Sequence, residues 1–148
     1  MNNWTSRAFA LLDKCLGSIL TEINELDWKL TISNKNERLA QHLSAFANYP
    51  NGGFMVFGIE DNGTLNNVQR GDADLIVNKL GNLSRMALEP PIGIQHSILR
   101  YREFDILCVF IPESNAKPVY VKNEGLFGSY KRPAKQTVKM SDGEVKSL

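Results

Sequence analysis

Two short apolar runs determine what kind of core this chain can build. Residues 106–111 are Ile-Leu-Cys-Val-Phe-Ile, without a charged or hydroxyl-bearing side chain, and residues 54–59 are nearly as apolar. Runs of this length that are rich in β-branched and aromatic residues are typical of strands buried within a sheet. The sequence therefore predicts two buried strands, one at 54–59 and one at 106–111.

Three further segments have apolar residues at helical spacing. They are residues 5–20, 36–48 and 72–87. Apolar side chains that recur every three or four residues form one face of an amphipathic helix. Residues 49–53, Tyr-Pro-Asn-Gly-Gly, end the second helix, and the two glycines permit a helix and a strand to pack closely through a tight turn.

An alternating stretch precedes the second helix. In residues 26–32 the apolar positions are 26, 28, 30 and 32, and the polar positions between them include Asp27 and Lys29. Alternate residues of a strand point to opposite faces of its sheet. We therefore predict a half-buried strand with Asp27 and Lys29 together on its polar face.

Turn residues divide the second half of the chain into hairpins. Residues 92–101 and 106–111 predict one hairpin, and residues 118–121 and 127–131 predict a second across Asn-Glu-Gly. Ser141 and Glu144 have the spacing of a capping box at the start of a last, short helix. The expected fold class is α+β, a mixed and largely antiparallel sheet of about five or six strands packed by three helices.

Length and composition indicate one compact domain. The chain has 148 residues, of which 43% are hydrophobic and 22% are charged, close to the averages of globular proteins. We treat residues 1–148 as a single domain, with an N-terminal helix in 1–21 and a core in 22–148. Because the last predicted helix begins just before residue 148, the chain is either a fragment of a longer protein or ends in a vestigial element, and we favour the fragment.

The cysteines and the apolar runs bear on the cellular compartment. Cys15 and Cys108 lie in apolar segments without the paired spacing of a zinc site. No apolar run approaches the ~18 residues of a membrane span, and the N-terminus lacks the pattern of a signal peptide. We expect two buried, reduced thiols in a cytoplasmic protein that does not contact a membrane.

Charge is distributed unevenly along the chain. Lysine and arginine total 17 against 16 aspartates and glutamates, which argues against a uniformly basic nucleic-acid-binding surface. Residues 117–148, however, contain seven basic and three acidic side chains, and residues 1–61 contain five basic and seven acidic ones. The near-neutral total therefore allows a local basic patch and a separate acidic one.

Carboxylates accompany the two predicted N-terminal strands. They are Glu22, Asp27, Glu60 and Asp61. Side chains from neighbouring strands could converge to hold Mg²⁺ or Mn²⁺, which prefer oxygen ligands, and Lys29 could then orient a phosphate. The alternative is an ordinary acidic surface in which Asp61 belongs to a turn.

The basic tail offers a second candidate site. Its candidate nucleic-acid contacts are Tyr130, Lys131, Arg132, Lys135 and Lys139. Lysine and arginine neutralise phosphates, and a tyrosine ring can stack on an unpaired base. The alternative is a solvated edge strand whose lysines protect it against aggregation.

Several of these motifs occur in an order that resembles a known family. The chain has Asp-Trp-Lys at 27–29, Ala-Phe-Ala-Asn at 45–48, Phe-Gly-Ile-Glu-Asp-Asn-Gly at 57–63, Pro-Val-Tyr at 118–120 and Tyr-Lys-Arg at 130–132. Over residues 22–144 this order resembles the Schlafen AlbA-like domain. The resemblance implies a DNA-binding domain of the kind found in bacterial transcriptional regulators. In animal Schlafens a related pair of domains carries a three-carboxylate endoribonuclease site that cleaves transfer and ribosomal RNA.

The resemblance also assigns roles to single residues. The family's three carboxylates correspond to Glu22, Asp27 and either Glu60 or Asp61. Asp27 stands where glutamate is commoner, which shortens the reach of that carboxylate by one methylene. The family's arginine on a late strand corresponds to Arg132.

Three functions follow from these patterns. The leading hypothesis is a DNA- or RNA-binding regulator that contacts phosphates with Lys29 and the basic tail, without a required cofactor. The alternative is an endoribonuclease that depends on Mg²⁺ or Mn²⁺ and cleaves structured RNA such as tRNA, with Glu22, Asp27, Lys29 and Glu60 or Asp61 as catalytic groups. The third is a dimerisation module, since members of the family often pair.

Overall fold

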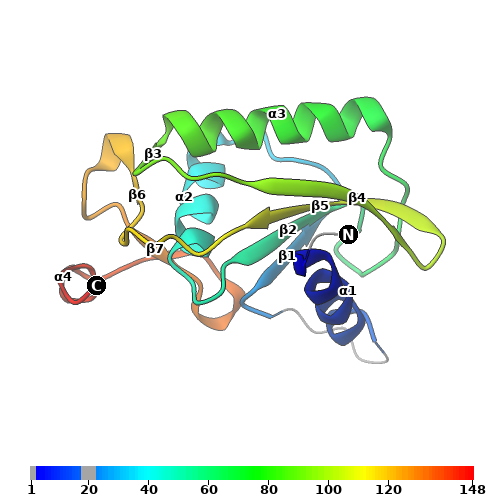
Figure 1. The fold of residues 1–148 in the computed structure, drawn as a ribbon, viewed down its shortest axis with the longest axis horizontal. Helices are drawn as coiled ribbons and strands as arrows, with labels where there is room; N and C mark the ends of the chain where they lie inside the picture. The colour runs from blue at the N-terminus through cyan, green and yellow to red at the C-terminus, as the bar shows by residue number, and fades with distance from the viewer. Residues whose placement is uncertain (1–2, 18–22) are drawn as a thin grey trace.

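The computed structural model describes residues 3–17 and 23–148, and its centre is a mixed four-stranded sheet (Figure 1). The strands lie in the order β1-β2-β5-β4. Their bounds are Leu26–Lys29 for β1, Gly53–Phe57 for β2, Gln95–Tyr101 for β4 and Phe104–Ile111 for β5. β1 and β2 are parallel, and the other neighbours are antiparallel. The two apolar runs form the central strands, as predicted, and β1 is an edge strand.

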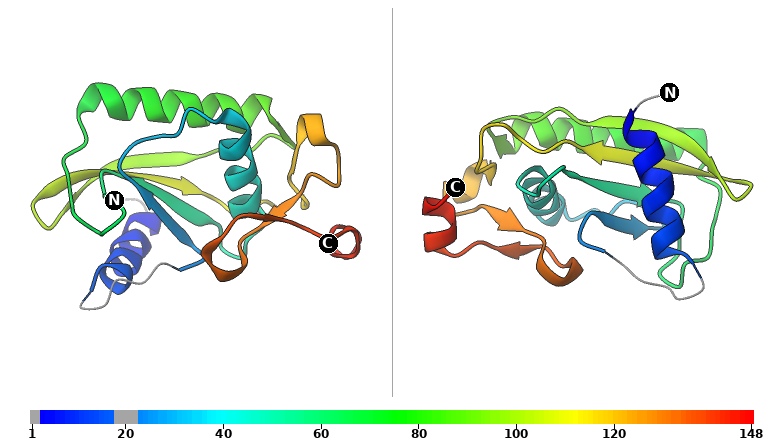
Figure 2. Two further views of the ribbon diagram at one scale, coloured as in Figure 1. Left: turned by 180° about the vertical axis from the view of Figure 1, so that it is seen from behind. Right: turned by 60° about the horizontal axis from the view of Figure 1, so that its bottom comes forward.

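Helices cover both faces of this sheet. They are α1 (Asn3–Cys15), α2 (Asn36–Ala47) and α3 (Arg70–Met86). α1 lies on one face, and α2 and α3 lie on the other (Figure 2). Alternate residues of β2 point to opposite faces of the sheet. Phe54 and Val56 pack with α1, whereas Met55 and Phe57 pack with α2 and α3. β2 is therefore buried on both sides.

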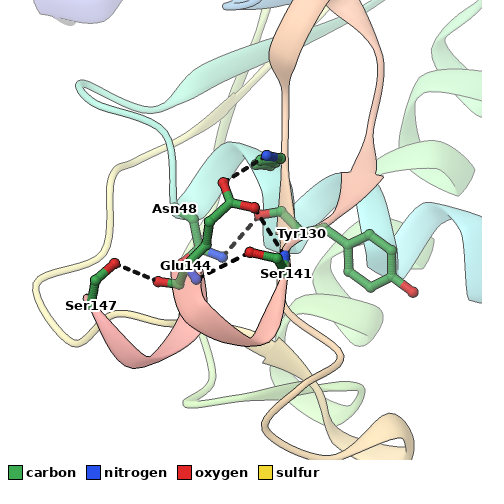
Figure 3. Close-up of polar contacts among 6 residues, drawn as sticks. Asn48, Tyr130, Ser141, Glu144 and Ser147 are labelled. Carbon is green, nitrogen blue, oxygen red and sulfur yellow. Dashed lines mark hydrogen bonds and ion pairs between the residues drawn. The ribbon is translucent and has the colours of Figure 1, made fainter.

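A fourth, short helix follows the capping box that the sequence predicts. This helix, α4, is Asp142–Lys146. The Glu144 N–H donates to Ser141 Oγ at 3.2 Å, and the Ser141 N–H donates to Glu144 Oε1 at 2.9 Å (Figure 3). This reciprocal pair confirms the predicted capping box.

Four two-residue strands form two small sheets apart from the main one. β3 (Leu88–Glu89) pairs with β6 (Tyr120–Val121), and β7 (Tyr130–Lys131) pairs with β8 (Val138–Lys139). The predicted hairpin between 118–121 and 127–131 was wrong in extent, because the two segments share a single bridge between Tyr120 and Ser129. A 3₁₀ turn directly after β6 separates the two segments, so each completes its pairing elsewhere.

The expected α+β class is confirmed. The main sheet has four strands, and the remaining strands of the described residues lie in the two small sheets. Three helices are long, and α4 has five residues. The strand expected at 26–32 ends at Lys29.

The glycine pair after α2 makes the close approach that the sequence predicts. Gly52 has a φ of 72°, in the left-handed region that favours glycine. A side chain on Gly53 would collide with the ring of Phe46 in α2. The pair therefore lets the end of α2 lie directly against the start of β2.

Two further expectations concern cysteines and membranes. Cys15 and Cys108 are buried, as predicted, and no disulfide joins them. Burial raises the pKa of the Cys108 thiol. Among the helices of the described residues, none has the length and apolar character that crossing a membrane requires.

Candidate nucleic-acid interface

β1 directs Asp27 and Lys29 to the face of the sheet that α2 covers. Asp27 is in register with Met55 and Lys29 with Phe57, and both of these β2 residues pack with α2 and α3. The predicted alternation of β1 is therefore confirmed. Asp27 is largely buried, with 11% of its side chain exposed, whereas 51% of the Lys29 side chain is exposed.

Asp27 is a buried carboxyl group with incomplete hydrogen bonding. Its Oδ1 lies 3.8 Å from Lys29 Nζ, and its Oδ2 is buried without a hydrogen-bond partner among the described residues. Burial raises the pKa of Asp27, the positive charges of Lys29 and Arg132 oppose this rise, and the negative charge of Asp61 adds to it. Desolvated carboxyl groups beside other charges are characteristic of functional sites.

Arg132 lies against the edge of β1 and is 3% exposed. Its Nε donates to the carbonyl of Asn24 at 3.2 Å, and its Nη1 donates to Thr137 Oγ1 at 3.2 Å. Its guanidinium lies over the ring of Phe46, with 4.7 Å between Cζ and the ring centroid. The Lys135 N–H donates to Asn24 Oδ1 at 2.7 Å. These contacts hold the chain after β7 beside the start of β1.

α2 brings Arg38 and His42 to the same place. Arg38 Nη2 donates to the carbonyl of Thr137 at 2.9 Å, and His42 Nδ1 lies 2.6 Å from Thr137 Oγ1. Burial, together with the positive charges of Arg38, Arg132 and Lys29, lowers the pKa of His42 to about 3. The positive charges of Lys29 and Arg132 therefore act on both residues, since they oppose the rise in the pKa of Asp27 and lower the pKa of His42.

These side chains form one group, which we call the β1-edge cluster. Its members are Asp27, Lys29, Arg38, His42, Arg132 and Thr137. They come from β1, from α2 and from the segment that begins after β7. Because three cations accompany a single carboxylate, the β1-edge cluster has a net positive charge even when Asp27 is ionised.

The structure distinguishes the two acidic residues that follow β2. Glu60 Oε2 accepts a hydrogen bond from Asn66 Nδ2 at 2.8 Å, and the Glu60 carbonyl accepts one from Trp28 Nε1 at 3.1 Å. Asp61 is exposed and acts electrostatically on Asp27. Of the pair, Asp61 is the carboxylate that lies beside the β1-edge cluster.

The predicted metal site depends on a residue that the structure does not describe. Glu22 lies outside the described residues. Within the described ranges, no three histidine, cysteine, aspartate or glutamate side chains lie close enough to hold a metal ion. Asp27 and Asp61, with the unpartnered Asp27 Oδ2, supply two carboxylates, which is an incomplete set for a divalent cation. The metal site of Glu22, Asp27, Glu60 and Asp61 stays a prediction.

The basic tail does not form one continuous exposed patch. Tyr130 is 7% exposed, and its hydroxyl donates to Glu124 Oε1 at 2.6 Å, so its ring is not open to a stacking base. Lys131 Nζ lies 2.6 Å from Glu144 Oε2. Lys135 and Lys139 are exposed. The tail therefore divides into Arg132 inside the β1-edge cluster, two exposed lysines and an ion-paired Lys131.

A family model described as Schlafen, AlbA_2 matches residues 22–141. This chain belongs to that family. The matched residues include β1 to β8 and α2, the helix that contributes Arg38 and His42 to the β1-edge cluster. The family resemblance expected from the order of motifs is thereby confirmed.

Two solved structures have the fold of this AlbA_2 domain. One is the N-terminal domain of a RecG-related protein from Nitrosomonas europaea, with a TM-score of 0.61, 24% identity, and coverage of 91% of this chain and 90% of that one. The other is the DIP2311 protein from Corynebacterium diphtheriae, with a TM-score of 0.60 and 15% identity over 99% of this chain, which spans 28% of that longer protein. No curated protein matches the sequence.

Sequence reasoning missed three members of the β1-edge cluster in this AlbA_2 domain, namely Arg38, His42 and Thr137. Arg38 and His42 are four residues apart on α2, so they share one face of that helix. That spacing was visible in the sequence. What the spacing could not show is that this face meets Thr137, which lies 95 residues beyond His42.

Proposed function

We propose that this chain is a nucleic-acid-binding domain that holds the phosphate backbone at the β1-edge cluster. The observation that carries the proposal is the convergence of Lys29, Arg38 and Arg132 from three separate parts of the chain. Cations grouped in this way neutralise successive phosphates and release the counterions bound to them. Such binding is electrostatic and has little dependence on base sequence.

The three cations have different roles in this proposal. Lys29 is half exposed and is free to move toward a phosphate. Arg38 is exposed, although one of its amino groups is bound to the Thr137 carbonyl. Arg132 is buried and hydrogen-bonded, so it contributes its positive field and fixes the loop. Lys135 and Lys139 are exposed beside the cluster and extend the basic surface.

The comparisons support a nucleic-acid context. The similar domain from Nitrosomonas europaea carries a name that relates its parent protein to an ATP-dependent DNA helicase. The match to the AlbA_2 family covers the whole cluster. We extend the proposal to a regulator that works in the cytoplasm, where buried thiols such as Cys108 stay reduced.

Binding to labelled DNA and RNA oligonucleotides tests the proposal. Fluorescence anisotropy at low salt should show binding by the full chain, and Lys29→Ala with Arg38→Ala should weaken it at least 10-fold. Lys14→Ala with Lys146→Ala is the matched control, because it removes the same charge from exposed residues in α1 and α4. Equal affinity of the two double variants would contradict the assignment of the site.

A second candidate function has one observation in its favour. The raised pKa and the unpartnered Oδ2 of Asp27 make this carboxyl group suitable for proton transfer during phosphodiester cleavage. We propose metal-dependent endoribonuclease activity on structured RNA as this alternative. Cleavage of labelled tRNA in Mn²⁺ that is abolished both by EDTA and by Asp27→Asn would support it. Intact tRNA under all of these conditions would leave binding as the function.

A further inference from the structure

His42 is a candidate ligand contact that its sequence position does not suggest. It lies half-buried on α2, within the β1-edge cluster. Its Nδ1 is 2.6 Å from Thr137 Oγ1, which also accepts a hydrogen bond from Arg132 Nη1 at 3.2 Å. The ring is therefore the last member of a chain of hydrogen bonds that begins at a guanidinium.

The direction of these hydrogen bonds fixes the proton on the ring. Thr137 is 3% exposed, so its hydroxyl hydrogen requires an acceptor within the protein. His42 Nδ1 is the acceptor in reach of that hydroxyl among the described residues. The hydroxyl accordingly donates to Nδ1, and a neutral imidazole with an acceptor at Nδ1 carries its proton on Nε2.

The surroundings keep this ring neutral. The charged groups that act on His42 are Arg38 on the same helix, Arg132 after β7 and Lys29 on β1, and all three are cations. Their charges, added to burial, lower the pKa of His42 to about 3. The ring therefore stays uncharged throughout the physiological pH range.

The protonated nitrogen is not enclosed by the described residues. Among the buried side-chain nitrogen and oxygen atoms of the described residues, Asp27 Oδ2 alone lacks a hydrogen-bond partner. Within the described ranges Nε2 of His42 has no hydrogen-bond partner and does not belong to that class, so these residues do not enclose it. A neutral N–H donor is thus left for a ligand beside the positive charges of Lys29, Arg38 and Arg132.

We propose that His42 Nε2–H donates a hydrogen bond to a phosphate oxygen of the bound nucleic acid. This inference rests on the proposed function, and Thr137 and Arg132 act as positioning residues that set the tautomer. A neutral donor adds direction to the contact without adding charge. Its contribution should therefore not depend on salt, in contrast to the contributions of Lys29 and Arg38.

The tautomer is tested by NMR without nucleic acid. Long-range ¹H–¹⁵N spectra of the full chain should show His42 with its proton on Nε2 and no protonation between pH 8 and pH 5, whereas His96 serves as the second histidine in the same spectra. Thr137→Val removes the hydroxyl and should allow a mixture of tautomers. A wild-type ring that titrates near pH 6.5, or that carries its proton on Nδ1, would overturn the proposal.

Binding variants test the contact itself. His42→Asn removes the donor at Nε2, whereas the longer amide of His42→Gln brings an N–H close to the same position. We expect His42→Asn to lower the affinity about 3- to 10-fold, with an unchanged slope of log K against log salt, and His42→Gln to recover most of the loss. Unfolding midpoints for both variants control for folding.

The outcomes separate this inference from the proposed function. If His42→Asn binds like wild type while Lys29→Ala and Arg38→Ala bind more weakly, the contact is refuted and the cluster remains the binding site. If His42→Asn reduces the salt slope by about 0.7 to 0.9, the ring acts as a cation and the inference is again overturned. If the wild-type chain binds no nucleic acid, both proposals fail together.

Discussion

Asn48 connects α2 to the segment that carries Arg132, and its replacement by alanine should destabilise the fold strongly. Its Nδ2 donates to the carbonyls of Val119 and Tyr130 at 3.0 and 3.1 Å, and its Oδ1 accepts the Val119 N–H at 2.8 Å (Figure 3 shows the contact with Tyr130). All three bonds are buried. One amide therefore satisfies main-chain groups in two different segments.

The magnitude follows from the groups that the substitution leaves without partners. The Val119 carbonyl keeps a hydrogen bond from Ser44 Oγ at 2.7 Å. The Val119 N–H and the Tyr130 carbonyl lose the partner that Asn48 provides. A buried polar group left unsatisfied costs about 1–3 kcal/mol, so Asn48→Ala should lower the free energy of unfolding by about 2–6 kcal/mol. Domains of this size are stable by about 5–15 kcal/mol in total.

Urea denaturation followed by tryptophan fluorescence measures this loss, because Trp4 and Trp28 are both buried. Asn78→Ala is the matched control, since Asn78 is exposed on α3 and its amide should contribute less than about 0.5 kcal/mol. A loss below about 1 kcal/mol for Asn48→Ala would refute the reasoning. It would mean that the segments at 119 and 130 do not depend on this amide.

Three further substitutions test the local arguments. Because burial raises the pKa of Asp27, the folded state binds this proton more tightly than the unfolded state does, so stability should fall as pH rises from the ordinary pKa of 3.8 through the folded pKa. Asp27→Asn should remove that dependence in urea titrations at pH 4 and pH 7. An unchanged pH profile in the variant would contradict the argument. Gly53→Ala should lower the free energy of unfolding by about 1–3 kcal/mol, because the new methyl group overpacks against Phe46. Gly71→Ala, with open space around it, should be neutral or raise that free energy by up to about 1 kcal/mol. Equal effects of the two variants in thermal unfolding would refute the contrast. Ser141→Ala should cost about 1 kcal/mol through loss of the N-cap and speed amide hydrogen exchange in α4, and unchanged exchange would show that the cap is dispensable.

Local sequence patterns predicted the elements with strong periodicity. The helix expected at 36–48 is Asn36–Ala47, and the one expected at 72–87 is Arg70–Met86. The apolar strands at 54–59 and 106–111 were placed correctly because a buried run needs no information from the rest of the chain. The last third was harder, since β6 and β7 have two residues each and their partners, β3 and β8, carry no alternation that a pattern could detect.

The site shows the same division between local and tertiary information. The alternation of residues 26–32 correctly placed Asp27 and Lys29 on one face. Arg38 and His42 were missed because their contact with Thr137 is tertiary. Tyr130 was assigned to the surface by its basic neighbours, but its side chain packs into the hydrophobic core with α2 and α3 and its hydroxyl donates to Glu124. Sequence proximity to lysine does not determine which side of a two-residue strand faces water.

Chemical-shift mapping tests most directly whether the β1-edge cluster is the nucleic-acid interface. Oligonucleotide is added to the ¹⁵N-labelled chain while the amide signals are followed. We predict that the shifted amides fall in residues 27–29, 38–42 and 132–137, whereas α1 on the opposite face of the sheet stays unchanged. Shifts concentrated on α1 or on the turn between β4 and β5, with none at the β1-edge cluster, would contradict the account.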